Sequence, residues 1–198
     1  MMSLVLASKS LTRQRLLHQA GLAFDVLVSP QAEENLKKDL LLNRTEPEKA
    51  AVLLADEKAR LVTLDHPDCY VLGADQTCGL GGRWIQRAHK REEAYNQLGD
   101  FSGKTHVLTT AVCLWRNGEC LWRYAENAYL TLLALSTEAQ ASYLSRLTDE
   151  DIQTFGLYQI EGIGIQLFSS VSGDFFTIQG LPLLPVLGIL RYHGLYPL

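Results

Sequence analysis

The sequence predicts an α/β fold, in which buried strands alternate with helices around one core. Nearly half of the chain is apolar, since 47% of its 198 residues are hydrophobic. The apolar residues form short β-rich runs that alternate with segments in which they recur at helical spacing, a pattern unlike that of a bundle or a sandwich. Because a chain of this length buries one good core, we expect residues 1–198 to form a single domain.

The first elements are expected to be a strand, a helix, a second strand and a long helix. The apolar run at residues 4–7 predicts a buried strand, and the helix after it is expected to stop at Gly21. Residues 24–28 predict the second strand. Residues 46–62 predict a long helix, because Pro47 suits a first helical turn and apolar residues recur along one face.

The next segment predicts a strand, a hairpin and a short helix. Residues 70–75 form an apolar run that we expect to end at its one carboxylate, Asp75. The glycine-rich turn at 79–82 is expected to join a hairpin to residues 83–85. A short helix at 92–98, ended by a glycine, follows.

The last third begins with a long β-hairpin. Residues 106–115 and 120–133 flank Asn117-Gly118, a dipeptide typical of a two-residue hairpin turn. A helix follows for which Ser136 is the expected N-cap. We expect this helix to cover residues 136–147. A glycine-rich loop at 156–164, a strand at 165–168 and a closing helix at 183–191 are expected after it.

Charge and composition exclude several classes of protein. A net charge of −4 argues against broad nucleic-acid binding, which needs a basic face. The chain opens with no basic leader or long apolar stretch, so we expect a soluble cytoplasmic protein. The five histidines lack metalloprotease spacing, and no Walker A or GxGxxG motif is present. The four cysteines form no zinc-type spacing and are expected to be reduced core residues.

Three places in the sequence are candidate sites for phosphate and metal. Hydroxyl and cationic side chains converge at residues 8–15, where a helix begins, and this arrangement suits phosphate; the alternative is an N-capping serine with solvated arginines. Asp75 is placed to hold a divalent cation or to activate a water, although an aspartate in a turn has the same pattern. Glu33-Glu34, expected in a loop, offers further oxygen ligands unless both side chains are simply solvated.

Further cations and a late loop complete the candidates. Lys58, Arg87 and Lys104 are cations that can neutralise a triphosphate, although single lysines usually lie on the surface. The glycine-rich run at 156–164 lets backbone approach a ligand, and its Glu161 can accept hydrogen bonds from a base edge; a structural loop is equally expected.

In order along the chain, these segments resemble the Maf family. Leu6-Ala7-Ser8-Lys9-Ser10-Leu11-Thr12-Arg13 is similar to the family's opening motif L-A-S-x-S-P-R-R, and Gly73-Ala74-Asp75-Gln76 to its G-A-D-[TQ] motif. The other similar segments are residues 29–34, 54–59, 102–106, 157–164 and 173–183. The chain departs from the family pattern at Leu11-Thr12 in place of Pro-Arg, at Arg87-Ala88 in place of Lys-Pro, and at Thr154 in place of a lysine.

The resemblance implies a fold and an activity. The fold is similar to that of inosine triphosphatases, an elongated mixed β-sheet flanked by helices, with two lobes around a central cleft. The implied enzyme is a nucleoside triphosphate pyrophosphatase, which cuts a non-standard or surplus nucleotide to its monophosphate and pyrophosphate. It implies Mg²⁺ or Mn²⁺ held by Glu34 and Asp75, with Asp75 also acting as base. A homodimer is also implied, to which Trp115 and Trp122 contribute unless the hairpin core buries them.

The resemblance also assigns the substrate contacts. The residues expected to clamp the triphosphate are Ser8, Ser10, Arg13, Lys58 and Arg87. Thr12, Gln76 and Glu161 occupy the positions that tune base preference. Gln76 and Glu161 are similar to members that prefer 7-methyl-GTP, whereas members that prefer dTTP or UTP carry Thr and Gln there; Thr12 matches neither type.

Two other functions remain open from the sequence. One is a catalytically degenerate homologue that binds nucleotide and acts through a protein partner in cell division. The departures from the family pattern at Leu11-Thr12 and Arg87-Ala88, where an arginine and a Lys-Pro are lost, favour it. The other is a nucleic-acid-binding module, suggested only by local basic clusters such as His89-Lys90-Arg91. We expect neither nucleic acid nor a membrane as a partner.

Overall fold

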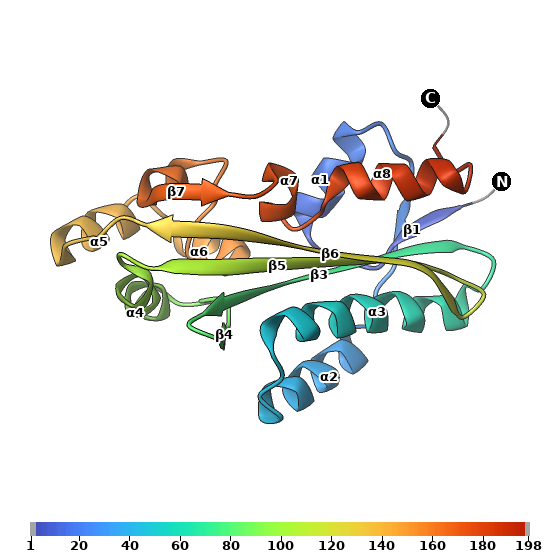
Figure 1. Cartoon of the computed structure of the whole chain (residues 1–198), viewed down its shortest axis with the longest axis horizontal. Helices are drawn as coiled ribbons and strands as arrows, with labels where there is room; N and C mark the ends of the chain where they lie inside the picture. The colour runs from blue at the N-terminus through green and yellow to red at the C-terminus, as the bar shows by residue number, and fades with distance from the viewer. Residues whose placement is uncertain (1–2, 197–198) are drawn as a thin grey trace. The chain divides into compact units, whose positions relative to one another are not determined.

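The computed structural model describes residues 3–196, and within this range the side chains of residues 30–33 lie outside the description. The strands are β1 (Leu4–Leu6), β2 (Asp25–Val26), β3 (Tyr70–Leu80), β4 (Arg83–Ile85), β5 (Thr105–Arg116), β6 (Glu119–Leu132) and β7 (Phe168–Ser172). They form a mixed sheet of seven strands in the order β2-β1-β3-β5-β6-β7, with β4 paired to β3. Helices flank this sheet (Figure 1), so the predicted α/β class is confirmed.

The helices lie between and after the strands in sequence. They are α1 (Leu11–Gln19), α2 (Pro30–Leu42), α3 (Pro47–Asp65), α4 (Arg91–Phe101), α5 (Thr137–Leu144), α6 (Asp149–Phe155), α7 (Phe175–Ile178) and α8 (Leu183–Tyr192). A 3₁₀ turn covers Ile163–Leu167. In the described part of the chain, none of these helices is long and apolar enough to cross a membrane.

The chain divides into two compact units. The first comprises the described parts of Met1–Thr77, Thr109–Asn127 and Asp174–Leu198, and the second comprises Cys78–Leu108 and Ala128–Gly173. Strands β3, β5 and β6 contribute residues to both units. Each unit has its own buried cluster of apolar side chains.

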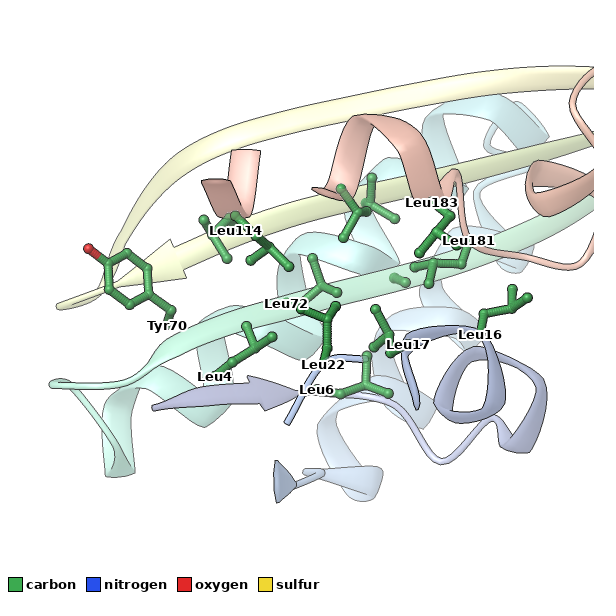
Figure 2. Close-up of a cluster of buried hydrophobic side chains, with 14 residues drawn as sticks. Leu4, Leu6, Leu16, Leu17, Leu22, Tyr70, Leu72, Leu114, Leu181 and Leu183 are labelled. Atoms are coloured by element: carbon green, nitrogen blue, oxygen red, sulfur yellow. The ribbon is translucent and has the colours of Figure 1, made fainter. Parts of the chain in front are cut away.

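The sheet of the first unit is covered on both faces. Successive side chains of a strand point to opposite faces, so Leu4 and Leu6 join one core whereas Val5 and Ala7 join the other. Helices α1 and α8 cover the leucine-rich face, whose side chains are drawn in Figure 2. Helix α3 covers the opposite face, where its alanines allow close packing. Strand β1 is therefore apolar throughout, as expected of a parallel strand between two helical layers.

In the second unit, helices pack against the end of β3, the start of β5 and the end of β6. Its core combines side chains of α4, α5 and α6 with Leu80 and Leu132. Arg91, from the basic cluster His89-Lys90-Arg91, ties these helices together: its Nη1 donates to Leu144 O at 2.6 Å and its Nη2 to Leu147 O at 2.8 Å. This arginine therefore has a structural role within the unit.

Local signals predicted most of the elements. The Asn117-Gly118 turn has positive φ at both residues, as a two-residue hairpin requires. Ser10 and Ser136 are N-caps whose side chains accept from backbone N–H groups. Trp115 is buried, with its Nε1 donating to Asp56 Oδ1 at 3.0 Å, and Trp122 packs against the core. Trp115 is thus a core residue, and a contribution of the half-buried Trp122 to a homodimer stays a prediction.

Two expectations about the site region were wrong. The loop expected at Glu33-Glu34 is helix α2, which Pro30 begins at a position that needs no N–H donor and which good helix formers continue. Strand β3 does not end at Asp75 but continues to Leu80, because β4 pairs with its second half. Glu34 is thus an exposed helical residue and Asp75 lies inside a strand.

Other boundaries also differ from the sequence prediction. Helix α4 passes through Gly99 to Phe101, since the chain turns only at Gly103, which has positive φ. Helices α6 and α7 were missed, although Thr148 forms a capping box with Asp151 and Asp174 caps α7. Of the strand expected at 165–168, the first three residues belong to a 3₁₀ turn, and Phe168 begins strand β7.

Candidate functional site

Asp75 lies where the parallel part of the sheet ends. Strand β1 pairs with β3 only up to Leu72, whose carbonyl accepts from Ala7 N at 2.9 Å. Asp75 follows three residues later on the face covered by α3, where its Oδ2 lies 2.7 Å from Lys58 Nζ. The two side chains are 14% and 11% exposed respectively. The structure thus brings together two residues predicted separately, a carboxylate and a cation, in a largely buried pair.

The close approach of α3 to β3 makes this pair possible. A Cβ at Gly73 would lie 2.2 Å from Ala55 O, so only glycine fits between the helix backbone and the strand. At the start of α3, Thr77 Oγ1 donates to Pro47 O at 2.7 Å. These contacts hold α3 against the strand on both sides of Asp75 and fix the helix position from which Lys58 reaches that carboxylate.

Neighbouring charges keep Asp75 ionised. Burial alone raises the pKa of the Asp75 carboxyl, but the charges of Lys58 and Arg13, and hydrogen bonds from Lys58 and the Gln76 N–H, outweigh it and lower the pKa below its ordinary value. Gln76 N donates to Asp75 Oδ1 at 2.6 Å. Asp75 is therefore a carboxylate at neutral pH.

Arg13 is a buried residue of the same unit. Its Nε donates to Gly180 O at 2.7 Å, and its Nη1 donates to Ser8 Oγ and to Ala74 O, both at 2.9 Å. Only 7% of Arg13 is exposed, so the alternative of a solvated arginine is wrong for this residue. These bonds tie α1 to β3 and to the segment after α7, and place positive charge near Asp75.

The other predicted residues of helix α1 lie around its start. The Ser10 side chain accepts from Arg13 N at 3.4 Å, so the N-cap interpretation holds for this serine. Ser8 is buried, and its Oγ accepts from Ser10 N as well as from Arg13. Thr12 is half-buried in the first helical turn. The helix start with its hydroxyls is present as predicted, and its phosphate contacts remain a prediction.

Gln76 points to the sheet face opposite Asp75, as alternation along a strand requires. Its Nε2 donates to Thr110 Oγ1 at 2.7 Å, to Thr177 O at 3.0 Å and to Ile178 O at 3.1 Å. The amide hydrogens are therefore committed to β5 and α7. The carboxamide oxygen is the part of Gln76 that these bonds leave to other partners.

Arg87 and Glu161 belong to the second unit. Arg87 is exposed, its Nη1 donates to Thr154 O at 2.9 Å, and its side chain lies against Gly156, where a Cβ would come within 2.8 Å of it. Glu161 is exposed at the start of the glycine-rich turn. Lys104 donates to Asp100 O at 2.8 Å. Within its unit, Arg87 thus contacts the position at which the family pattern has a lysine.

The carboxylates suit a hard divalent cation that is shared with substrate. Among the described residues, which exclude the Glu33 side chain, no group of three or more His, Cys, Asp or Glu side chains could hold a metal ion. Mg²⁺ commonly uses one or two carboxylates together with substrate phosphates and water. Each Asp75 oxygen retains a lone pair beyond its present contact. Glu34, on α2, is exposed on a helix that packs against α3.

Sequence reasoning missed three residues that support the site. Thr110 and Thr177 are fully buried and hold the Gln76 amide, and Gly180 accepts from Arg13 with a positive φ that suits glycine. Only Gly180 carried a local signal, its place before Leu-Pro in a similar motif. The threonines have no such signal, because their role depends on contacts between distant segments.

Comparisons with known proteins match nearly the whole chain. A family model described as Maf-like protein matches residues 3–193. A protein of Brucella suis named 7-methyl-GTP pyrophosphatase is 44% identical over 188 residues, 95% of this chain and 94% of that protein. A protein of Rhodopseudomonas palustris named nucleoside triphosphate pyrophosphatase is 44% identical over 192 residues, 97% of this chain and 94% of that protein.

A dITP/XTP pyrophosphatase structure from Mycobacterium abscessus has a TM-score of 0.43 and 13% identity, covering 99% of this chain and 98% of that chain. The family assignment depends on the sequence matches alone. Because these matches span nearly the whole chain at high identity, the chain belongs to the Maf-like protein family.

Proposed function

We propose that this chain hydrolyses the α–β phosphoanhydride bond of a nucleoside triphosphate, with 7-methyl-GTP favoured over dTTP and UTP, and releases the monophosphate and pyrophosphate. The observation that carries the proposal is the largely buried Lys58–Asp75 pair beside Arg13. A carboxylate and cations at one buried point suit a reaction in which a water attacks a polyanion. We also propose a cytoplasmic location, where free nucleotides are handled.

The enzyme class rests on the relatives. Both proteins compared above carry names of nucleoside triphosphate pyrophosphatases, and both align over almost their full length. The predicted class of hydrolase is therefore confirmed at this level. The choice of nucleotide is finer and belongs to the proposal.

Asp75 and Lys58 have complementary roles in the proposed reaction. Asp75 stays ionised and accepts a hydrogen bond, and then the proton, from the attacking water. Lys58 lies within reach of the same carboxylate and neutralises phosphate charge when substrate enters. Arg13 fixes Ser8 and adds positive potential without leaving its buried bonds.

Metal dependence is part of the proposal. Asp75, together with Glu34, would hold Mg²⁺ or Mn²⁺. When bound, the cation supplies neutralisation of phosphate charge and a more acidic water. This matters because a carboxylate with a lowered pKa is a weak base toward free water.

Gln76 in the first unit and Glu161 in the second unit each carry an acceptor that suits a guanine nucleotide. The Gln76 bonds leave its carboxamide oxygen for a substrate donor, and Glu161 offers an exposed carboxylate. Guanine presents N1–H and N2–H donors, which a carboxylate or a carboxamide oxygen can accept. The name of the Brucella suis relative supports the same choice for this chain.

Pyrophosphate release from a panel of triphosphates tests the proposal. The panel contains 7-methyl-GTP, GTP, dTTP, UTP, CTP and pseudo-UTP, each with Mg²⁺, with Mn²⁺ and with excess EDTA. We expect metal-dependent release, fastest from 7-methyl-GTP. Release fastest from dTTP or UTP would refute the base preference, and release unaffected by EDTA would refute metal dependence. Folded protein that is silent across the panel would favour the degenerate nucleotide-binding homologue.

A further inference from the structure

We propose that Thr110 is a positioning residue that holds the Gln76 carboxamide in one orientation, so that Gln76 offers the nucleotide only its oxygen Oε1. The inference rests on the proposed function, in which Gln76 takes part in base selection. Thr110 lies in none of the segments that resemble the family, and Oε1 is the atom of Gln76 that is then available to substrate.

The orientation follows from the acceptors around Nε2. An amide NH₂ has two hydrogens, and here it faces three acceptors, Thr110 Oγ1, Thr177 O and Ile178 O, at 2.7, 3.0 and 3.1 Å. Turning the carboxamide over would place Oε1 against two backbone carbonyl oxygens, which only accept. The reversed orientation is therefore strongly disfavoured, and Gln76 cannot present a donor without breaking these bonds.

Thr110 decides how firmly the amide is held. Its hydroxyl donates to Thr177 O at 2.8 Å, so its oxygen lone pairs face the Gln76 amide. Thr110 and Thr177 are both 0% exposed, which leaves no ready replacement by water. Among the three bonds, the one to Thr110 is also the shortest.

The carbonyls of α7 are themselves fixed. Thr177 N donates to Asp174 Oδ2 at 2.7 Å, and Thr177 Oγ1 lies 2.7 Å from Glu126 Oε2. The N-cap of α7 and strand β6 thus hold the peptide groups to which Gln76 and Thr110 bond. The acceptor geometry around Gln76 is therefore built into the fold and does not wait for substrate.

A double-mutant cycle tests the coupling. Thr110→Val keeps the side-chain shape and removes the acceptor, Gln76→Ala removes the amide, and the double variant combines them. The affinity of each is measured for the α,β-methylene analogues of 7-methyl-GTP and dTTP, which lack the cleavable bond, beside kcat and KM for the parent nucleotides. We expect each single variant to weaken binding of the better analogue about fivefold or more and to raise KM with little change in kcat.

In the double variant, the effect of Thr110→Val should disappear. We expect affinity within about twofold of Gln76→Ala alone, since Thr110 then has no amide to hold. Thr110→Ser, which keeps the hydroxyl, should restore wild-type affinity. Thr109→Val is the matched control, because Thr109 is another buried threonine of β5, and its hydroxyl donates to Asn127 Oδ1 at 2.7 Å. The effect of Thr109→Val on affinity should multiply with that of Gln76→Ala.

Several outcomes would overturn the inference. These are multiplicative effects of Thr110→Val and Gln76→Ala, unchanged affinity in Thr110→Val, a serine variant as weak as the valine variant, or no binding of either analogue to the wild type. By contrast, coupled affinities in a protein that releases no pyrophosphate would sustain the inference and refute only the proposed hydrolysis. Melting temperatures of all variants show whether a loss of binding reflects a loss of fold.

Discussion

Lys58 Nζ lies 2.7 Å from Asp75 Oδ2, across the interface between α3 and β3. The pair is largely buried: burial raises the Asp75 pKa, and Lys58 provides the largest opposing effect. This relationship ties the ionisation of the proposed catalytic carboxylate to one lysine.

Lys58→Met is therefore expected to raise the pKa of Asp75. In the wild type the Asp75 pKa lies below its ordinary value of 3.8. The active carboxylate is therefore present at any pH above 3.8 and is protonated only at lower pH. Without Lys58, only Arg13 and the Gln76 N–H oppose the burial effect, so the Asp75 pKa rises and the acid limb of the kcat/KM profile should move to higher pH. Lys58→Arg, which keeps the charge, should move the limb less. A profile that loses only its height, with the limb unmoved, would contradict the electrostatic role of Lys58.

Gly73→Ala should disturb the same pair without altering either charge. The added Cβ would lie 2.2 Å from Ala55 O, so α3 has to shift away from β3. We expect a loss of about 1–3 kcal/mol in the free energy of unfolding and a large fall in turnover. Gly188→Ala is the control, because nothing lies within 4 Å of its Cβ in helix α8, and it should stabilise by about 0.5–1 kcal/mol. Wild-type activity in Gly73→Ala would show that the close approach is dispensable.

Arg13→Lys should destabilise the protein although it keeps the charge. Lysine cannot reproduce the bonds from Nε to Gly180 O and from Nη1 to Ser8 and Ala74. The expected loss is about 2 kcal/mol or more, measured by urea unfolding. Arg15→Lys, on the exposed side of the same helix, should change stability by about 0.5 kcal/mol or less. Equal effects of the two substitutions would contradict a structural role specific to Arg13.

His106 should make the second unit sensitive to acid. It is 0% exposed, and burial lowers its pKa from 6.5 to about 4, with Nε2 2.5 Å from Tyr158 Oη. Between these two pH values His106 is protonated in the unfolded chain but neutral in the folded chain. The free energy of unfolding therefore falls as the pH drops from about 6.5 toward 4. Between pH 7 and pH 5 we expect a loss of about 2 kcal/mol from this group. His106→Gln should remove this loss, whereas His66→Gln, at an exposed position, should retain it.

The sequence predicted those parts of the fold that have local signals. The Asn117-Gly118 turn, the Ser10 cap and the first helix stop at Gly21 each depend on neighbouring residues, and each is present. Helix α2 was missed because Glu33-Glu34 was interpreted as part of an acidic loop, although a run of good helix formers follows Pro30. The prediction ended strand β3 too early, at Asp75. A carboxylate ends a strand only where no neighbouring strand pairs with the residues after it, and here β4 pairs with residues 78–80.

The candidate site shows the same division. Asp75 and Lys58 were predicted one by one, from residue type and motif, but their pairing depends on the approach of α3 at Gly73. The burial of Arg13 depends on Gly180, 167 residues later in the chain. No local pattern records contacts of this kind, and the threonines that hold Gln76 were missed for the same reason.

Asp75→Asn tests the central claim most directly. Pyrophosphate release from 7-methyl-GTP with Mg²⁺ or Mn²⁺ is compared in wild type and variant, with unfolding and circular dichroism as checks of the fold. We expect the variant to fold and its turnover to fall by about 10³-fold or more, because the amide neither accepts the proton nor carries the charge that faces Lys58. Turnover at the wild-type rate in the folded variant would remove Asp75 from the chemistry and contradict the account.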